Sequence, residues 1–377
     1  MSGGGGAYSR SGVDVAAGDR AVELMRTAVE STLGPRVLAG LGGFAGLWDA
    51  SDLKTYRHPV LATATDGVGT KLCIAQAMGV HRTVGFDLVG MVVDDIVVTG
   101  ARPLFMTDYI ATGKVDPVVV AEIVEGIAAA CAATGTSLIS GETAEHPGVM
   151  RPGEYDLAGA AVGLVERDQV LGPDRVAAGD VVIGLASSGL HSNGYSLVRA
   201  VVRDLGWDWE RFVPEFGRTL GEEALEPTRL YTSAMLKLAE TPGTGLHGMA
   251  HVTGGGLAAN LARVLPPSLG AVVSREAWPV PPVFHVLHDA AQVAWGDLER
   301  TLNLGIGMVA IVAEAGVQAS LASLAGSGQQ AVPIGRVAPA ADIQAEAKQR
   351  QADPADLISG TKGVAGGAVL LTGGYQE

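Results

Sequence analysis

The sequence predicts a mixed α/β protein built from two domains. Its 377 residues are 47% hydrophobic, which is more chain than one hydrophobic core usually takes. Segments with strand and helix patterns alternate along it, and a proline-containing stretch near Pro173 interrupts them. We therefore expect an N-terminal domain at 1–170 and a second domain at 171–339. Composition then turns to alanine, glycine and mixed charge, so we expect a weakly ordered tail at 340–377.

The elements of the first half follow from apolar spacing and from capping residues. Leu88, Val92 and Ile96 recur at helical spacing, and Asp116-Pro117 is a typical helix start that Gly135 would end. The patterns predict helices over 22–29, 88–99 and 117–134, and strands over 60–65, 104–111, 136–140 and 157–165.

The second half gives the same two kinds of pattern. They predict strands over 180–186, 306–312 and 332–337, and helices over 195–205, 228–238, 257–265 and 283–292. The order of these segments does not determine how the strands pair, so the sheet topology stays open.

Charge and cysteine content exclude several classes of protein. A formal net charge of -14 disfavours nonspecific binding to nucleic acid or to an anionic membrane. Cys73 and Cys131 each lie in an apolar, helix-like context, which indicates reduced thiols in a cytoplasmic protein. The first residues lack the apolar core of a signal peptide, and we find no uninterrupted apolar stretch of the roughly 20 residues that a bilayer requires.

A glycine-containing loop follows the first predicted strand, in Asp66-Gly-Val-Gly-Thr-Lys71. Gly67 and Gly69 allow backbone N–H groups to approach phosphate oxygens, and Thr70 and Lys71 add a hydroxyl and a positive charge. The spacing is not that of a P-loop. A tight turn with a solvated aspartate and lysine is the equally common alternative.

Three carboxylates from separate segments are candidate Mg²⁺ ligands. Asp66 ends a predicted strand, Asp95 belongs to the Asp94-Asp95 pair on an apolar helix, and Glu142 follows a strand in Ser140-Gly-Glu-Thr143. Hard oxygen ligands of this kind suit nucleotide-bound Mg²⁺. Because adjacent helical residues point about 100° apart, only one of the aspartate pair should face any one site. The alternative is that one or both of Asp94 and Asp95 lie on a solvated face.

Two further loops lead into predicted helices. Ser187-Ser-Gly-Leu-His-Ser-Asn-Gly194 combines hydroxyls, an amide and His191, and His251-Val-Thr-Gly-Gly-Gly256 is a second glycine-rich turn. Helix N-termini of this kind suit anions such as phosphate. A structural histidine and a flexible hinge are the alternatives. The residues by themselves indicate a nucleotide-using enzyme but no particular substrate.

Taken in order, these segments resemble aminoimidazole ribonucleotide synthetase, the phosphoribosylformylglycinamidine cyclo-ligase family. The likeness covers most of residues 8–338. Besides the loops above it includes Tyr8, Gly12-Val-Asp14, Gly40-Leu-Gly-Gly-Phe44, Gly85–Gly100, Asp108–Lys114, Tyr155–Gly159 and Asn303–Met308. Each segment alone is unspecific, whereas the ordered set is highly specific.

The resemblance implies a homodimer whose N-terminal sheets pair into an intersubunit barrel, with a C-terminal sheet packed against helices. It implies ATP-dependent closure of the imidazole ring of formylglycinamidine ribonucleotide, through an iminophosphate. It also implies roles for particular residues: Mg²⁺ ligands Asp66, Asp95 and Glu142; ATP contacts Gly67, Gly69, Thr70, Lys71, Asp95, Gly141 and Glu142; substrate contacts Ser188, His191, Ser192, Asn193, Thr253, Gly254 and Gly255; and catalytic groups His191 and Lys71.

The chain departs from the family pattern at a few positions. Ser9 replaces the usual lysine after Tyr8, and Asp94 replaces the usual asparagine, which adds a negative charge beside Asp95. His146 and Leu302 replace a methionine and a phenylalanine. Two rival functions follow: another ATP-using enzyme of the same superfamily, and a nucleotide-binding regulatory protein that has lost catalysis.

Overall fold

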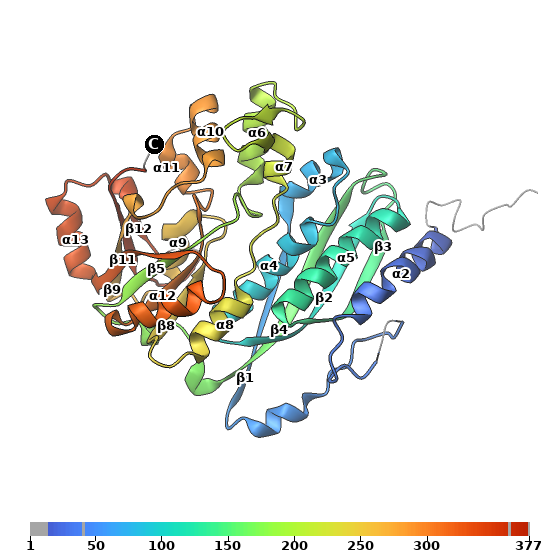
Figure 1. Cartoon of the computed structure of the whole chain (residues 1–377), viewed down its shortest axis with the longest axis horizontal. Helices are drawn as coiled ribbons and strands as arrows, with labels where there is room; N and C mark the ends of the chain where they lie inside the picture. Colours follow the sequence, from blue (N-terminus) through green and yellow to red (C-terminus); the bar gives the residue numbers. More distant parts are fainter. Residues whose placement is uncertain (1–13, 40–41, 361–362, 376–377) are drawn as a thin grey trace, which may run out of the picture. The chain divides into compact units, whose positions relative to one another are not determined.

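The computed structural model describes residues 14–39, 42–360 and 363–375, and its chain forms two compact units (Figure 1). The first comprises residues 1–96 and 102–167, and the second residues 97–101 and 168–377. Tyr8, Ser9, Gly12 and Gly40, which belong to the family resemblance, lie outside the described residues.

The first unit is a four-stranded sheet with helices on one face. Its strands run in the order β1 (Pro59–Gly67), β4 (Tyr155–Glu166), β2 (Arg102–Thr112) and β3 (Ser137–Glu145). The β2–β3 pair is parallel and the other two pairs are antiparallel. The helices are α2 (Val15–Glu30), α3 (Leu72–Met78), α4 (Val84–Val97) and α5 (Pro117–Thr134), and Figure 1 shows α5 lying beside α2.

Glycine allows α4 and α5 to contact each other backbone to backbone. A Cβ atom built on Gly85 of α4 would lie 2.2 Å from the backbone nitrogen of Ile127 in α5. By length and composition α5 could cross a membrane, but 56% of it is buried inside the unit, as in a core helix. The expected capping is confirmed: the Asp116 side chain accepts from the N–H groups of Val118 and Val119, and Gly135 ends the helix at φ 68°.

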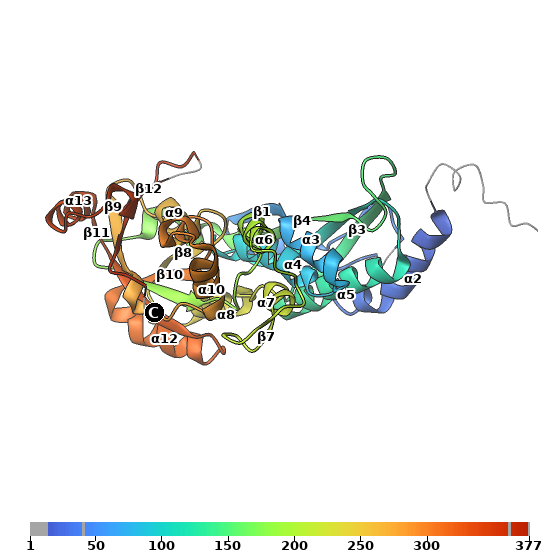
Figure 2. The same cartoon turned by 90° about the horizontal axis from the view of Figure 1, so that it is seen from above.

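The second unit is a seven-stranded sheet between two layers of helices (Figure 2). Its strand order is β12 (Leu357–Ser359), β13 (Ala368–Thr372), β9 (Leu269–Ser274), β11 (Ala331–Pro339), β5 (Val181–Ala186), β10 (Ile306–Val312) and β8 (Leu246–His251). Alternate residues of β10 enter two different cores. Val309 and Ile311 pack with α9 (Gly256–Arg263), whereas Met308 and Ala310 pack with α8 (Thr232–Glu240) and α12 (Val317–Ala325).

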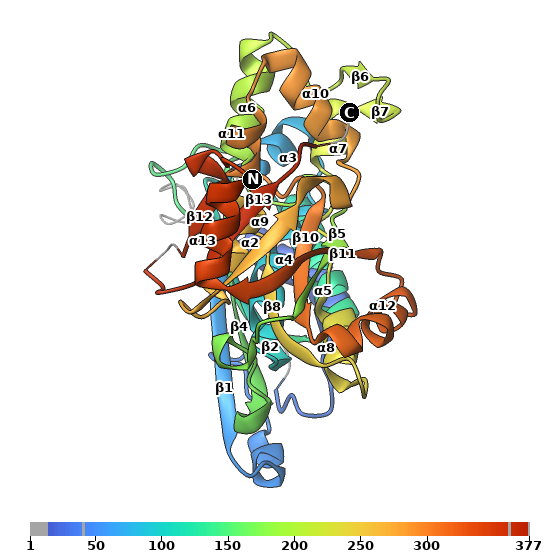
Figure 3. The ribbon, with the colours of Figure 1, turned by 90° about the vertical axis from the view of Figure 1, so that its left-hand side faces the viewer.

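The helices of this unit are α6 (Tyr195–Asp204), α7 (Leu220–Ala224), α8 (Thr232–Glu240), α9 (Gly256–Arg263), α10 (Pro282–Ala291), α11 (Trp295–Glu299), α12 (Val317–Ala325) and α13 (Ala340–Gln349). Figure 3 shows α10 beside α6. A small hairpin pairs β6 (Phe212–Val213) with β7 (Arg218–Thr219). Short 3₁₀ turns occupy Ala50–Thr55, Gly69–Lys71, Arg167–Gln169, Pro173–Arg175, Arg275–Ala277, Glu314–Gly316 and Pro354–Asp356.

Two expectations from the sequence are wrong. The segment 340–377 is not a weak tail, because α13 buries Ile343 against Val272 and Leu370, and β13 pairs in parallel with β9. Its apolar residues are few, but Ile343 and Leu370 lie at positions that pack against the sheet. In addition, Ser140–Thr143 does not follow a strand: β3 continues through it to Glu145, paired with β2 throughout.

Candidate functional site

The loop of the first unit begins inside the sheet and leaves it within a few residues. Asp66 and Gly67 are the last residues of β1, and Gly69–Lys71 forms a 3₁₀ turn that leads into α3. Gly69 takes φ 78°, a left-handed conformation that favours glycine. The Asp66 carboxylate accepts the N–H of Gly67 at 2.7 Å. The structure thus forms the expected turn, with the backbone of Gly69 exposed.

Lys71 is placed differently from the exposed charge expected of a phosphate-binding lysine. Its side chain has no exposed area, and Nζ lies 2.8 Å from Oδ1 of Asp87, which is equally buried. Burial of both charges is costly, and only a close ion pair repays that cost. The sequence does not indicate the role of Asp87, since one aspartate on an apolar helix gives no signal of its partner.

The three expected Mg²⁺ ligands lie on separate elements of the first unit, Asp66 on β1, Glu142 on β3 and Asp95 on α4. Asp66 lies in a row with Gly159, Asp108 and Gly141 on neighbouring strands. Glu142 is one position beyond this row, on the strand at the other edge. Its Cβ therefore leaves the opposite face, about 14 Å away at three strand spacings.

No group of three or more acidic, histidine or cysteine side chains suited to a metal occurs among the described residues. Asp94 is fully buried and Asp95 is half-buried on α4, so the two do differ in exposure as their spacing predicts. Within one chain, Asp66, Asp95 and Glu142 do not form a metal site.

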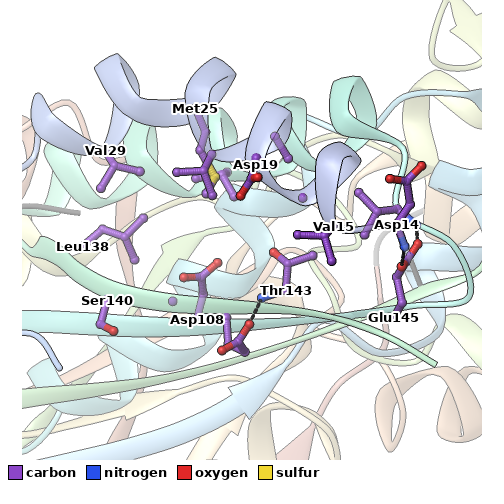
Figure 4. A pocket seen from close by; sticks show the side chains of 17 residues that line it. Asp14, Val15, Asp19, Met25, Val29, Asp108, Leu138, Ser140, Thr143 and Glu145 are labelled. Atoms are coloured by element: carbon purple, nitrogen blue, oxygen red, sulfur yellow. Dashed lines mark hydrogen bonds between the residues drawn. The ribbon is translucent and has the colours of Figure 1, made fainter. Parts of the chain in front are cut away.

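A pocket of about 400 Å³ lies between α2 and the sheet, bordered by Gly141 and Glu142 (Figure 4). Asp108 points into it from β2 and is 8% exposed. Burial raises the pKa of Asp108 from its ordinary value of 3.8 to about 7. Glu145 closes one end, because its carboxylate accepts the N–H groups of Asp14 at 2.6 Å and Val115 at 2.7 Å.

In the second unit, strand register brings the two predicted anion loops together. Ala186 at the end of β5 pairs with Ile306, and His251 at the end of β8 pairs with Met308, so both strands end beside the start of β10. A Cβ atom built on Gly254 would lie 3.4 Å from Oδ1 of Asn193. Ser187–Gly194 and His251–Gly256 are therefore neighbours at one edge of the sheet.

His191 is held rigidly in the first of these loops. It is 3% exposed, takes φ 61°, and its Nε2 accepts the backbone N–H of Ser188 at 3.1 Å. The Tyr231 ring lies 6.1 Å away between centroids, and Tyr231 Oη donates to the carbonyl of Ala186 at 2.9 Å. A Cβ on Gly307 would approach His191 Cε1 to 2.4 Å, so glycine is required there.

The buried amide of Asn260, which no sequence pattern indicated, braces the second loop. Asn260 donates from Nδ2 to the carbonyl oxygens of Thr253 at 3.1 Å and Gly256 at 2.8 Å. Gly255 and Gly256 take φ 103° and 73°, so the turn depends on glycine. The backbone and hydroxyl of Thr253 are fixed before any ligand arrives.

Another asparagine holds the first loop from beneath. Asn303 donates from Nδ2 to the carbonyls of Gly189 at 2.9 Å and Leu190 at 3.2 Å, and its Oδ1 accepts the N–H of Gly305 at 2.8 Å. Leu302 packs against the same loop, because a Cβ on Gly194 would lie 2.3 Å from its Cδ2. No spacing rule in the sequence identifies Asn303 as such a clamp.

Two family models match the chain. Residues 49–165 match the N-terminal domain of AIR synthase related protein, and residues 177–348 match the C-terminal domain. The phosphoribosylformylglycinamidine cyclo-ligase of Desulfitobacterium hafniense is 50% identical over 331 residues, which are 88% of this chain and 96% of that protein. The enzyme of the same name from Thermosynechococcus vestitus is 49% identical over 330 residues, which are 88% and 96% of the two chains.

Structures of more distant proteins share the fold. Thiamine-monophosphate kinase from Stenotrophomonas maltophilia has a TM-score of 0.59 at 19% identity, covering 85% of this chain and 93% of that one. Escherichia coli HypE has a TM-score of 0.60 at 17% identity, covering 86% and 91%. A HypE structure in complex with ATP has a TM-score of 0.57 at 19% identity, covering 90% and 89%.

Proposed function

The chain belongs to the phosphoribosylformylglycinamidine cyclo-ligase family of AIR synthases, and we propose that its two units divide the work of that reaction. The enzyme uses ATP to cyclise formylglycinamidine ribonucleotide to 5-aminoimidazole ribonucleotide in purine biosynthesis. The proposal assigns the ribonucleotide to the paired loops of the second unit and the nucleotide to the first unit.

The observation that carries this assignment is the meeting of Ser187–Gly194 with Thr253–Gly255. Together these loops bring Ser188, Ser192 and Asn193 beside the glycine turn from which helix α9 begins. Hydroxyls, an amide and a helix N-terminus are suited to a ribose phosphate. Since Asn260 and Asn303 already fix both loops, binding requires little ordering of the protein.

In the proposed mechanism, the formyl oxygen attacks the γ-phosphorus of ATP and ADP leaves. An amidine nitrogen of the same substrate then attacks the activated carbon, phosphate leaves with the former formyl oxygen, and the new ring loses a proton. His191 is the proposed group for that proton, because the Ser188 N–H holds its ring within Ser187–Gly194, and Nε2 would release that N–H as it takes the proton. Positioning and exclusion of water supply the remaining acceleration.

The first unit suits the nucleotide through backbone rather than through a free lysine. Gly67, Gly69 and Thr70 form the exposed turn, and the Lys71–Asp87 pair anchors it from inside. Lys71 is therefore proposed to position this turn. Mg²⁺ remains an expectation for the nucleotide. The scattered carboxylates do not fit a metal site within one chain, so no reaction step here depends on one.

The outer face of the first unit's sheet suits the homodimer that the family resemblance implies. Leu61 is 59% exposed and Tyr109 is 39% exposed, with Thr63 and Thr65 between them on the same face. An exposed apolar sheet face of this kind favours a protein interface. Leu61→Arg should convert a dimer to a monomer in light scattering, and a dimer unaffected by it would contradict this assignment.

Isotope transfer tests the proposed chemistry directly. With ¹⁸O in the formyl group of the substrate, the label should appear in the released phosphate. Unlabelled phosphate would contradict oxygen activation. Release of ADP that does not depend on formylglycinamidine ribonucleotide would instead support another ATP-using enzyme of the same superfamily, and binding of ATP without turnover would support the regulatory protein.

A further inference from the structure

We propose that Tyr375, near the C-terminus, is a positioning residue for the two loops assigned to the ribonucleotide, Ser187–Gly194 and Thr253–Gly255 (the ribonucleotide loops). It acts on them through Glu299. The inference rests on the proposed function of those loops. It adds a contribution from a segment beyond residue 348, where the match to the C-terminal family model ends.

Glu299 is the centre of a buried ionic cluster. It is 9% exposed, and its two carboxylate oxygens accept from Arg275 Nε at 2.9 Å and Nη2 at 2.8 Å. Tyr375 Oη donates to Glu299 Oε1 at 2.6 Å, and Asp356 accepts from the same guanidinium at 2.6 Å. A bidentate, charge-assisted arrangement of this kind fixes both position and orientation.

Aromatic packing holds Tyr375 in place over this cluster. Its ring centroid lies 5.1 Å from that of Trp295 and 6.1 Å from that of Trp278, and Arg275 Cζ lies 5.8 Å from it. Arg275 also donates to the carbonyl of Gly373 at 3.3 Å, so the chain just before the tyrosine is tied down. Burial, together with the Glu299 carboxylate, raises the pKa of Tyr375, so its hydroxyl stays a donor.

The backbone of Glu299 is the surface against which the glycine turn packs. A Cβ on Gly256 would lie 1.8 Å from the Glu299 carbonyl oxygen, and a Cβ on Gly194 would lie 3.0 Å from the carbonyl of Thr301. Trp278 donates to the carbonyl of Leu304 at 2.9 Å, just beyond the Asn303 clamp. The segment 299–304 therefore contacts both ribonucleotide loops, and the C-terminal cluster holds its first residue.

Displacement of Glu299 would shift the Gly254–Gly256 turn. The backbones at Gly256 and Glu299 lie so close together that a Cβ atom on Gly256 would clash with the Glu299 carbonyl oxygen. Shifts of this size misplace a bound substrate rather than unfold the chain. The expected signature of losing Tyr375 is weaker use of the ribonucleotide with unchanged use of ATP.

The test compares Tyr375→Ala, which removes ring and hydroxyl, with Tyr375→Phe, which removes only the hydroxyl. Tyr375→Ala should raise KM for formylglycinamidine ribonucleotide about tenfold, the scale of one lost charge-assisted hydrogen bond. Tyr375→Phe should give a smaller rise, and KM for ATP should stay within twofold for both. Glu346→Gln is the matched control, because it breaks an exposed ion pair with Arg336 in the same C-terminal region.

Thr253→Val separates this inference from the function on which it rests. If Thr253→Val raises KM for the ribonucleotide and Tyr375→Ala does not, the turn binds substrate but Tyr375 does not position it. If Thr253→Val has no effect, the assignment of the turn itself is wrong. A fall in thermal stability of Tyr375→Ala with both KM values unchanged would show a purely structural role and overturn the proposal.

Discussion

The candidate residues of the first unit lie far apart on their sheet, whereas those of the second unit meet at one edge. Asp66 and Glu142 occupy strands at opposite edges, and their Cβ atoms leave opposite faces. The loops after β5 and β8 instead flank the same strand, β10. Similar residue types in similar sequence contexts therefore form a site only where strand order brings them together.

The same contrast applies to charged side chains. In the first unit Lys71 and Asp87 form a buried ion pair with each other. In the second unit, buried amides of Asn260 and Asn303 donate to backbone carbonyls of the two loops and hold them in place. The ion pair stabilises the Gly69–Lys71 turn from inside the first unit, whereas the amides fix the conformation of the two loops proposed to bind the ribonucleotide.

The largest expected effect comes from breaking the internal pair. Lys71→Met leaves Asp87 buried without its ammonium partner, which typically costs about 3–5 kcal/mol of unfolding free energy. Chemical denaturation should show this loss, and Asp87→Leu added to Lys71→Met should recover much of it. A Lys71→Met protein of normal stability that no longer uses ATP would return Lys71 to the phosphate-binding role.

Removal of the histidine in the second unit should affect turnover more than stability. His191→Ala should lower kcat by about 10²-fold, the usual contribution of a positioned proton-transfer group. If kcat persists while KM for the ribonucleotide rises, His191 binds phosphate instead.

Asp108 offers a smaller effect on stability, and its size depends on pH. The raised pKa means that the folded protein holds a proton that the unfolded chain releases above about pH 4, so stability falls as pH rises from about 4 to 7. Asp108→Asn should therefore be more stable at pH 8, by on the order of 2 kcal/mol. That gain should shrink toward pH 4. Thermal unfolding with the same gain at every pH would contradict this account.

The smallest expected effect concerns the amide that braces the glycine turn. Asn260→Ala removes hydrogen bonds to the carbonyls of Thr253 and Gly256 and should raise KM for the ribonucleotide about fivefold, since one such bond contributes about 1 kcal/mol. KM for ATP should not change. Equal rises in KM for the ribonucleotide and KM for ATP would mean that the turn maintains the structure of the protein generally and does not act on one substrate.

Local signals in the sequence predicted local structure well. The Asp116 cap and the Gly135 stop predict α5 to the residue, because capping depends on near neighbours. The loop that includes His191 was identifiable for the same reason. Glu142 was misplaced at the end of a strand because its pairing with Tyr109 depends on β2, which lies elsewhere in the chain.

Other features depend on contacts that no window of sequence contains. The apolar residues of 340–377 are too sparse to indicate a strand, yet β13 is stable because β9 is its neighbour. Lys71 has the sequence context of a phosphate ligand, and only the position of Asp87 on α4 shows that it is buried. Asn303 and Glu299 support the ribonucleotide loops across the fold, so their sequence neighbours carry no sign of that role.

Equilibrium binding to a Gly254→Val variant tests the division of labour between the units most directly. The added side chain would press on Asn193, where the two ribonucleotide loops meet. Calorimetry on the full chain should show that formylglycinamidine ribonucleotide no longer binds, while ATP binds as it does to the unchanged protein. Loss of ATP binding with the ribonucleotide retained would contradict the assignment of the two ligands to the two units.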